Sequence, residues 1–513
     1  MKPIYADSET SDAALDAALH EVAETYRRNL PPGTLQAFPV DGLDRLNLPV
    51  EVASFTLPAD EKTGTPDRVF DGFGYGLTRA EATVGALGEL TEAAHSEVDL
   101  RSRDFVTGSY VEMVNQFGAG GVCDPLTLCL PAGSDYTPDT PLEWTEAVRY
   151  RTGERVFLPT EFAAVYGHQM RGREPMIVTI TNGLGAGLTR DQALSHGVLE
   201  LLQRDGNCTT FRAMDEGVVI EPDEVRDASL LELLDTLTKA GLEVVPKLAS
   251  TEFGLSNVYV VGRDAAGAGL PIQTTACGEA SHLDRERALR KAMIEFAAAR
   301  SRKAFMHGPL ELIDRVSPDW YLPGYLESFD FSTQEKRATD AMIAWMQMSQ
   351  TELESVLSDT VFSDRRRVKL SELPTVEPAA IRDPSDRMDA VARRLEAESL
   401  EVLVIDHTPP GQSEVSVVRG VVPGLEGETM SYGRLGERGA ARLLARGESF
   451  VGLGPASGPR LRVPLTADAE ERLGGPVWFD PDAAAARVGQ HYALYREPKA
   501  HTVPVAMGQT LDR

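Results

Sequence analysis

Residues 74–92 read GYGLTRAEATVGALGELTE, and residues 185–203 read GAGLTRDQALSHGVLELLQ. The two stretches align glycine with glycine, threonine with threonine and alanine with alanine, and they place Glu89 opposite Glu200. A looser third copy spans residues 284–295 and also ends on a glutamate. Similarity at a fixed spacing indicates repeated supersecondary units. The chain therefore predicts three similar helices, each carrying one glutamate at the same position.

Each copy begins with a helix-start signal. Thr78 with Glu81, and Thr189 with Gln192, have the spacing of a capping box, in which the hydroxyl and the later side chain satisfy backbone N–H groups of the first turn. Asp284 can cap the third helix without a boxed partner. Glycine-rich turns precede the first two helices, so close-approach backbone and N–H groups that can bind an anion are expected there.

Three turns into each helix comes a glutamate flanked by apolar residues, which would need a partner if it were buried. Carboxylates held close together repel one another unless a hard cation joins them, and Mg²⁺ is the natural cation beside phosphates. The residue three positions later lies on the same face. The candidate metal ligands are Glu89, Glu92, Glu200, Gln203 and Glu295. A merely structural bundle of duplicated helices is the alternative.

Basic side chains flank these glutamates in the sequence. Arg204, Lys291 and Arg300 could contact phosphate oxygens, or they could pair with carboxylates of neighbouring helices. The chain contains no Gly-Lys dipeptide and so no Walker A sequence, and it has no glycine spacing of the Rossmann type. A nucleotide would therefore bind outside the familiar glycine-rich loops.

The wider pattern mixes strands with amphipathic helices, which favours an α/β or α+β fold. Helices are expected over residues 11–28 and within 333–357, and little regular structure is expected over 452–480. Strands are expected at 52–57, 176–180, 257–261 and 403–406.

Composition narrows the class of protein. The chain has 513 residues, 42% of them hydrophobic and 25% charged, which is typical of a globular protein with one large core or two. It has no apolar run long enough for a membrane span, and its start lacks the apolar core of a signal peptide. Its four irregularly spaced cysteines disfavour zinc sites and disulfides, so a reduced, cytoplasmic setting is expected. The net charge of −27 disfavours nucleic acid and anionic lipid, although acidity can serve solubility alone.

These residues resemble the YcaO family. The family's first motif, approximately G-K-G-x-T-x(7)-A-L-x-E-x-x-E-R, is matched by residues 74–93. Its second motif, S-N-G-x-x-A-G-N-T followed by G-L-x-E-x-x-E-R, is matched by residues 181–204, and its third by residues 278–300. A V-P-G-L sequence that also occurs in the family is present at 422–425. The resemblance covers roughly residues 66–428.

The resemblance implies a YcaO fold over residues 66–428, with a helical lead-in over 1–65 and a C-terminal extension over 429–513. It implies an enzyme that uses ATP and Mg²⁺ to modify backbone amides of ribosomally synthesised peptides. In that reaction a nucleophile adds to the amide carbonyl, ATP phosphorylates the resulting oxyanion, and loss of phosphate leaves an azoline or a thioamide. A small precursor gene nearby would indicate azolines, and a TfuA-like neighbour would indicate thioamides.

The resemblance also assigns roles to residues. Glu89, Glu200 and Glu295 would form the catalytic centre and hold Mg²⁺ together with Glu92 and Gln203. The nucleotide would be contacted by Asn182, Arg204, Lys291 and Arg300. His282 would be a proton shuttle or a structural histidine.

Partners are implied as well. The substrate would be a precursor peptide. The first 65 residues are too short for the substrate-presenting domain found in many such enzymes, so a separate presenting or sulfur-transfer protein is expected, and a homodimer is possible.

The chain departs from the family pattern at several positions, and it lacks the Pro-x-Pro-x-Pro tail of many azoline-forming members. The replaced family residues are Lys by Tyr75, Ser by Gly85, Arg by Ala93, Asn by Leu188, Glu by Gln203 and Gln by Ala298. Loss of polar contacts to the nucleotide motivates two alternatives: a YcaO-like scaffold or regulatory partner without turnover, and an acidic metal-binding enzyme without nucleotide.

Overall fold

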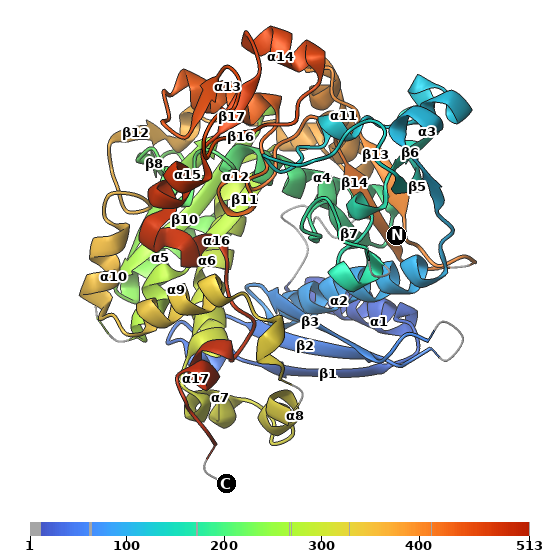
Figure 1. Ribbon diagram of the computed structural model, residues 1–513. Helices are drawn as coiled ribbons and strands as arrows, with labels where there is room; N and C mark the ends of the chain where they lie inside the picture. The colour runs from blue at the N-terminus through green and yellow to red at the C-terminus, as the bar shows by residue number, and fades with distance from the viewer. Residues whose placement is uncertain are drawn as a thin grey trace.

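A computed structural model of the chain describes residues 12–60, 64–170, 173–265, 267, 269–327, 329–411 and 413–511. It contains four sheets and many helices, which confirms the mixed α/β class (Figure 1). No helix among these residues has the length and apolar character needed to cross a membrane.

The first sheet is formed near the N-terminus and lies along one side of the molecule (Figure 1). Its antiparallel strands follow the order β1 (Thr34–Pro39), β2 (Val50–Leu57) and β3 (Arg68–Tyr75). Helix α2 (Arg79–Ser102) packs on this sheet, and α1 (Asp12–Asn29) packs on α2. Strand β3 is the last strand of its sheet.

A second sheet ends at the strand of the second repeat. Its order is β4 (Val106–Gly108), β5 (Leu142–Arg149), β13 (Leu403–Asp406), β14 (Ser416–Val421) and β7 (Leu184–Gly187), and β6 (Arg155–Pro159) pairs with β5. Helix α3 is Tyr110–Phe117. Helix α4 (Arg190–Asn207) packs on β7 and β14, and α11 (Pro384–Ala397) packs on α4.

The third sheet ends at the strand of the third copy. Its order is β11 (Gly278–His282), β10 (Ser256–Asp264), β9 (Leu242–Ser250), β8 (Val218–Glu221) and β12 (Arg366–Lys369). Helix α6 (Arg285–His307) packs on β11 and β10, and it also contacts α5 (Ala228–Lys239).

The remaining elements complete the outer shell. Helices α7 (Leu310–Val316), α8 (Tyr321–Glu327), α9 (Lys336–Met346) and α10 (Gln350–Leu357) follow α6. The C-terminal part holds α12 (Thr429–Tyr432), α13 (Glu437–Ala445), β15 (Val451–Leu453), β16 (Leu461–Arg462), α14 (Ala467–Leu473), β17 (Val477–Phe479), α15 (Pro481–Val488), α16 (Tyr492–Tyr495) and α17 (Thr502–Ala506).

Three strand–helix units, β3–α2, β7–α4 and β11–α6, contact one another in a cycle. Helix α2 touches β7, α4 touches β11, and α6 touches β3. Figure 1 shows these three helices on different sides of the middle of the molecule. Each unit places the last strand of a sheet next to that centre.

Glycine allows each strand to lie directly on its helix. A Cβ built at Gly74 would meet the carbonyl oxygen of Ala82 at 1.7 Å, and one at Gly185 would meet that of Ala193 at 2.2 Å. Both distances lie far inside van der Waals contact, so a larger residue would push strand and helix apart. This contact explains why the two sequence stretches share glycine and alanine at equivalent positions.

The caps at the helix N-termini are as predicted from the sequence, with one difference. Thr78 and Glu81 form a capping box, and Asp284 caps α6. Thr189 accepts the N–H of Gln192 as expected, but the Gln192 side chain accepts from Leu188 and not from the cap residue itself. The second box is therefore only half formed.

Two expectations about regular structure were wrong. Residues 176–180 form no strand: the carbonyl oxygen of Ile180 accepts from the Arg419 side chain and not from a neighbouring strand, and the strand of this unit is β7, which pairs with β14. The stretch 452–480 is not irregular. It contains α14 and a small sheet of order β15–β17–β16.

Candidate active site

A cavity of about 2330 Å³ lies between the three units. Its wall includes the repeated glutamates and their neighbours, together with apolar residues of α1. All five predicted metal ligands line it, namely Glu89, Glu92, Glu200, Gln203 and Glu295. The fold thus brings together side chains that are far apart in the sequence.

Each repeated glutamate is hydrogen bonded to the backbone of its own strand region. A terminal strand has N–H groups without a neighbouring strand, and here a carboxylate accepts one of them. One oxygen of each carboxylate is fixed in this way, and the other oxygen of Glu200 pairs with Arg204. The bonds join Phe73 N to Glu89 at 2.6 Å, Gly183 N to Glu200 at 3.2 Å, and Glu279 N to Glu295 at 3.1 Å.

The residue three positions after the glutamate links one unit to the next. Glu92 accepts the N–H of Ala186 in β7 at 2.9 Å. Gln203 donates its amide N–H to the carboxylate of Glu279 in β11 at 3.2 Å. The cycle of units is therefore joined by hydrogen bonds at the cavity wall as well as by packing.

The protein environment raises the pKa values of these carboxyl groups, so it disfavours their charged forms. Burial raises the pKa of Glu89 to about 7, although the N–H of Phe73 opposes the shift. Burial, followed by the charges of Glu89 and Glu200, raises the pKa of Glu92 well above its usual value. Burial and the charge of Glu279 raise the pKa of Glu295. Such a group of carboxyls favours either a bound proton or a bound cation.

The carboxylates do not form a complete metal cage by themselves. Within the described ranges, no three His, Cys, Asp or Glu side chains converge closely enough to hold a metal ion. Mg²⁺ is usually bound by one or two carboxylates, with phosphate oxygens and waters completing its shell. Raised carboxyl pKa values and incomplete convergence together fit Mg²⁺ shared with a phosphate ligand.

Several basic side chains line the same cavity, and three of them, Arg204, Lys291 and Arg302, act on the repeated glutamates. Arg204 lies 3.5 Å from Glu200 and 3.4 Å from Glu279, and Lys291 lies on α6 one turn before Glu295. Arg302, which sequence reasoning missed, lines the cavity two turns after Glu295. Its position seven residues after the glutamate was a usable signal, because residues seven apart share a helix face.

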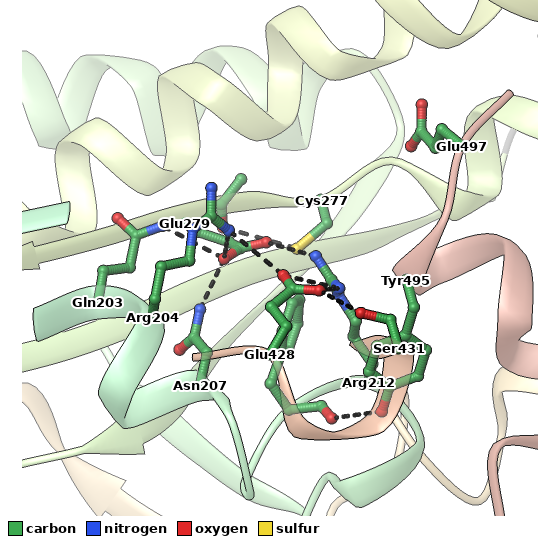
Figure 2. A network of polar contacts seen from close by, with 12 residues as sticks. Gln203, Arg204, Asn207, Arg212, Cys277, Glu279, Glu428, Ser431, Tyr495 and Glu497 are labelled. Atoms are coloured by element: carbon green, nitrogen blue, oxygen red, sulfur yellow. Dashed lines mark hydrogen bonds and ion pairs between the residues drawn. The ribbon is translucent and has the colours of Figure 1, made fainter. Parts of the chain in front are cut away.

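Glu279 is the centre of the polar contacts on this side of the cavity. Figure 2 shows Gln203, Arg204 and Asn207 directed at its carboxylate. Asn207 donates to Oε2 of Glu279 at 2.6 Å, and Arg204 donates to the same oxygen at 3.4 Å. Sequence reasoning missed Glu279, although it lies between the matched Gly278 and His282 of the third motif.

Two expected nucleotide contacts are not in the cavity wall. Arg300 is completely buried and pairs with Asp44 at 2.8 Å and with Asp264 at 3.1 Å. Its guanidinium joins the N-terminal segment to β10, so its role is corrected to a structural one. Asn182 is half-buried and adjoins Gly183, but the cavity lining includes Thr181 and not Asn182.

His282 lines the cavity as a neutral imidazole. Burial, together with nearby basic groups such as Arg387, lowers its pKa to about 3. Its Nδ1 accepts the N–H of Asp284 at 2.9 Å, so the single ring proton resides on Nε2. Tyr75, which replaces the lysine of the family motif, also lines the cavity, and burial raises the pKa of its phenol well above the usual value. Tyr75 is therefore an uncharged group.

A family model described as YcaO cyclodehydratase, ATP- and Mg²⁺-binding, matches residues 73–426. This range covers more than half of the chain. The chain belongs to the YcaO family. The expected family is confirmed, and the family description names ATP and Mg²⁺, the two expected cofactors.

Sequence relatives extend over most of this YcaO protein. An uncharacterized protein of Methanothermobacter thermautotrophicus is 26% identical over 409 residues, covering 79% of this chain and 93% of the relative. An uncharacterized protein in the tfuA 3′ region of Rhizobium leguminosarum bv. trifolii is 27% identical over 393 residues, covering 75% of this chain and 81% of the relative.

Solved structures share the fold. YcaO from Methanopyrus kandleri, bound with AMPPCP and Mg²⁺, has a TM-score of 0.54 and 21% identity, covering 84% of this chain and 96% of that one. A heterocyclase in complex with substrate and cofactor has a TM-score of 0.58 and 16% identity, covering 83% of this chain and 55% of that one. At these identities the similarity establishes the fold alone.

Proposed function

We propose that this YcaO protein uses ATP and Mg²⁺ to activate a backbone amide of a ribosomally synthesised peptide, which becomes an azoline or a thioamide. The observation that carries the proposal is the meeting of Glu89, Glu200 and Glu295 at one cavity, each fixed by a backbone N–H of its own unit. Family membership and the ATP- and Mg²⁺-binding description of the family support it.

The carboxylates are assigned to cation binding. Glu89, Glu200 and Glu295 would hold Mg²⁺, and Glu92 would assist. Gln203 uses its amide nitrogen on Glu279, and Figure 2 shows its amide oxygen turned away from that carboxylate, so the oxygen is available as a ligand. ATP, when bound with Mg²⁺, would supply the phosphoryl group that converts the amide oxygen into a leaving group.

The basic side chains would stabilise charge on the phosphate side. Arg204, Lys291 and Arg302 all face the cavity, and fixed cations near a transferred phosphoryl group lower the barrier because they need no reorganisation. His282 can donate only through Nε2, since Nδ1 is occupied by Asp284. A precursor peptide and a separate presenting or sulfur-transfer protein complete the proposed reaction system.

Thioamide formation is favoured over azoline formation by one observation. One relative is named for its place in the tfuA 3′ region, and a TfuA-like neighbour indicates thioamides. In this version external sulfide is the nucleophile, and sulfur replaces the amide oxygen, which leaves as phosphate.

Titration calorimetry with Mg·ATP tests the cofactor assignment. Wild type should bind at micromolar to submillimolar concentration, and Glu200→Gln should lose this binding, because a neutral amide is a poorer Mg²⁺ ligand. Glu398→Gln, at the exposed end of α11, is the matched control and should bind as wild type does. No heat with wild type at millimolar nucleotide would instead support the scaffold alternative, and metal binding without ATP would support the nucleotide-free enzyme.

Mass spectrometry of a candidate precursor peptide tests the chemistry. Loss of one water per modified residue identifies an azoline, and exchange of one oxygen for sulfur identifies a thioamide. An unchanged peptide with ATP, Mg²⁺, sulfide and the partner protein all present would contradict the proposal.

A further inference from the structure

Arg204 belongs to a closed ring of alternating charges, two members of which, Arg212 and Glu428, lie outside the three family motifs. Arg204 pairs with Glu279, Glu279 with Arg212, Arg212 with Glu428, and Glu428 with Arg204. The four nitrogen–oxygen distances are 3.4, 3.6, 3.3 and 4.0 Å in that order. Figure 2 shows the two guanidinium groups on opposite sides of the two carboxylates.

The backbone at Arg212 is strained. Its φ is +62°, in the left-handed region that non-glycine residues rarely adopt. Residues held in such conformations need support from their surroundings, and here Tyr495 supplies it. The Tyr495 hydroxyl accepts the N–H of Ala213 at 3.1 Å and donates to the carbonyl of Phe211 at 3.3 Å.

The same tyrosine also holds the side chain. The guanidinium carbon of Arg212 lies 5.0 Å from the ring centroid of Tyr495 and 5.0 Å from that of Phe211. Only 13% of the Arg212 side chain is exposed. A strained, aromatic-flanked arginine that points at two carboxylates differs from an ordinary surface ion pair.

We propose that Arg212 is a positioning residue, which shares Glu279 and Glu428 with Arg204 and so holds the Arg204 guanidinium at the cavity wall for an anionic, phosphate-bearing ligand. This role rests on the proposed function. Arg212 itself is not part of the cavity lining, whereas Arg204 and Glu279 are. Arg212 therefore acts through Arg204 and not by contact with the ligand.

Charge balance explains the effect. With both arginines present, the two carboxylates of the ring are neutralised. Without Arg212, the ring loses one positive charge. Arg204 is then shared among Glu279, Glu428 and Glu200, while Arg496 also acts on Glu428. The loss of Arg212 thus draws Arg204 toward Glu428, which does not line the cavity, because opposite charges attract more strongly where water is excluded.

A double-mutant cycle on Mg·ATP affinity tests the proposal by calorimetry. Arg212→Gln should raise the dissociation constant at least roughly tenfold, as expected when one partner of a buried charge pair is removed. Arg212→Lys keeps the charge and should recover part of the loss. Arg337→Gln is the matched control, because Arg337 lies 3.8 Å from the Tyr492 ring but has no link to Glu279, and it should bind as wild type does.

The decisive comparison is made in the Arg204→Gln background. If Arg212 acts through Arg204, adding Arg212→Gln should change the dissociation constant by less than about twofold, because coupled residues are non-additive. If the two losses multiply, Arg212 contributes independently and the positioning role is wrong. Wild-type affinity in Arg212→Gln would also overturn it.

Urea unfolding of the ligand-free proteins separates this proposal from the proposed function. The same four proteins should show coupling between Arg204 and Arg212. The loss of unfolding free energy in the double variant should be smaller than the sum of the losses in the two single variants. If wild type binds no nucleotide, the proposed function is wrong. The unfolding cycle still tests whether Arg204 and Arg212 are coupled through the ring. Additive shifts of the unfolding midpoint would overturn the ring. If Arg212→Gln does not fold, Arg212→Lys takes its place in both cycles.

Discussion

The backbone N–H of Glu279 donates to the carboxylate of Glu295 at 3.1 Å, while the side chain of Glu279 accepts from three residues of α4. One residue of β11 therefore fixes the third repeated glutamate and also anchors the helix that carries the second. Strand and helix geometry, and not loops, thus determine where the site carboxylates lie. Sites built on regular elements are held more precisely than sites on loops.

Mg²⁺ affinity should depend on pH through Glu89. The pKa of this carboxyl is raised to about 7, so below that pH it holds a proton that the cation must displace. Affinity should rise as pH increases through 7. Calorimetry in buffers of different ionisation enthalpy should detect proton release near pH 6, and Glu89→Gln should reduce it, leaving the release from Glu92 and Glu295. Affinity that is flat between pH 5.5 and 8, values chosen to bracket that pKa, would contradict this assignment.

The same shift predicts a stability change in the absence of metal. A carboxyl whose folded-state pKa is raised from its ordinary value of 4.5 to about 7 binds more protons when folded than when unfolded between those two pH values. Its contribution to stability is therefore present below pH 4.5 and is lost as pH rises through 7. Glu89→Gln should remove this component, so the variant's midpoint in urea should fall less than that of wild type over the same range.

Gly74→Ala should destabilise the first unit. The new methyl group would lie 1.7 Å from the carbonyl oxygen of Ala82, so β3 must move away from α2. Overpacking of this kind costs about 1–3 kcal/mol. Gly42→Ala is the matched control, because a Cβ there meets nothing within 4 Å. Equal unfolding midpoints for the two variants would show that the close approach is not important.

Arg300→Met should reduce stability without a specific effect on nucleotide binding. The change removes one partner of a buried group and leaves Asp44 with no ion-pair partner among the described residues, which costs about 3–5 kcal/mol. Chemical unfolding measures the loss. Calorimetry on the folded fraction should give wild-type affinity for Mg·ATP, and a strong loss of affinity at full folding would return Arg300 to the nucleotide site.

Much of the site could be predicted because its signals are local. Threonine caps, glycine–alanine contacts and a glutamate at a constant distance from each cap repeat in the sequence. Residues such as Arg212 and Glu428 could not be found in this way, because they meet Glu279 only in the folded chain. Arg300 was assigned to the nucleotide site because it follows Glu295 closely in the sequence. Its ion pairs with Asp44 and Asp264 could not be predicted, because these residues meet it only in the folded chain.

The prediction of helices and strands was wrong where the local sequence pattern and the tertiary packing disagree. Residues 176–180 have the β-branched composition of a strand, but they pack as an irregular segment against the core of the second sheet. The glycines and prolines of 452–480 concealed three short strands, whose pairing depends on residues distant in the sequence. Short elements of this kind are stabilised by tertiary contacts and not by propensity.

The most direct test is a crystal structure with Mn²⁺ and a non-hydrolysable ATP analogue, in which anomalous scattering locates the cation. The account predicts a Mn²⁺ peak in the central cavity, bound by at least two of Glu89, Glu200 and Glu295 and by phosphate oxygens. Clear density for the analogue elsewhere, or a cavity without a cation at saturating Mn²⁺ and analogue, would contradict it.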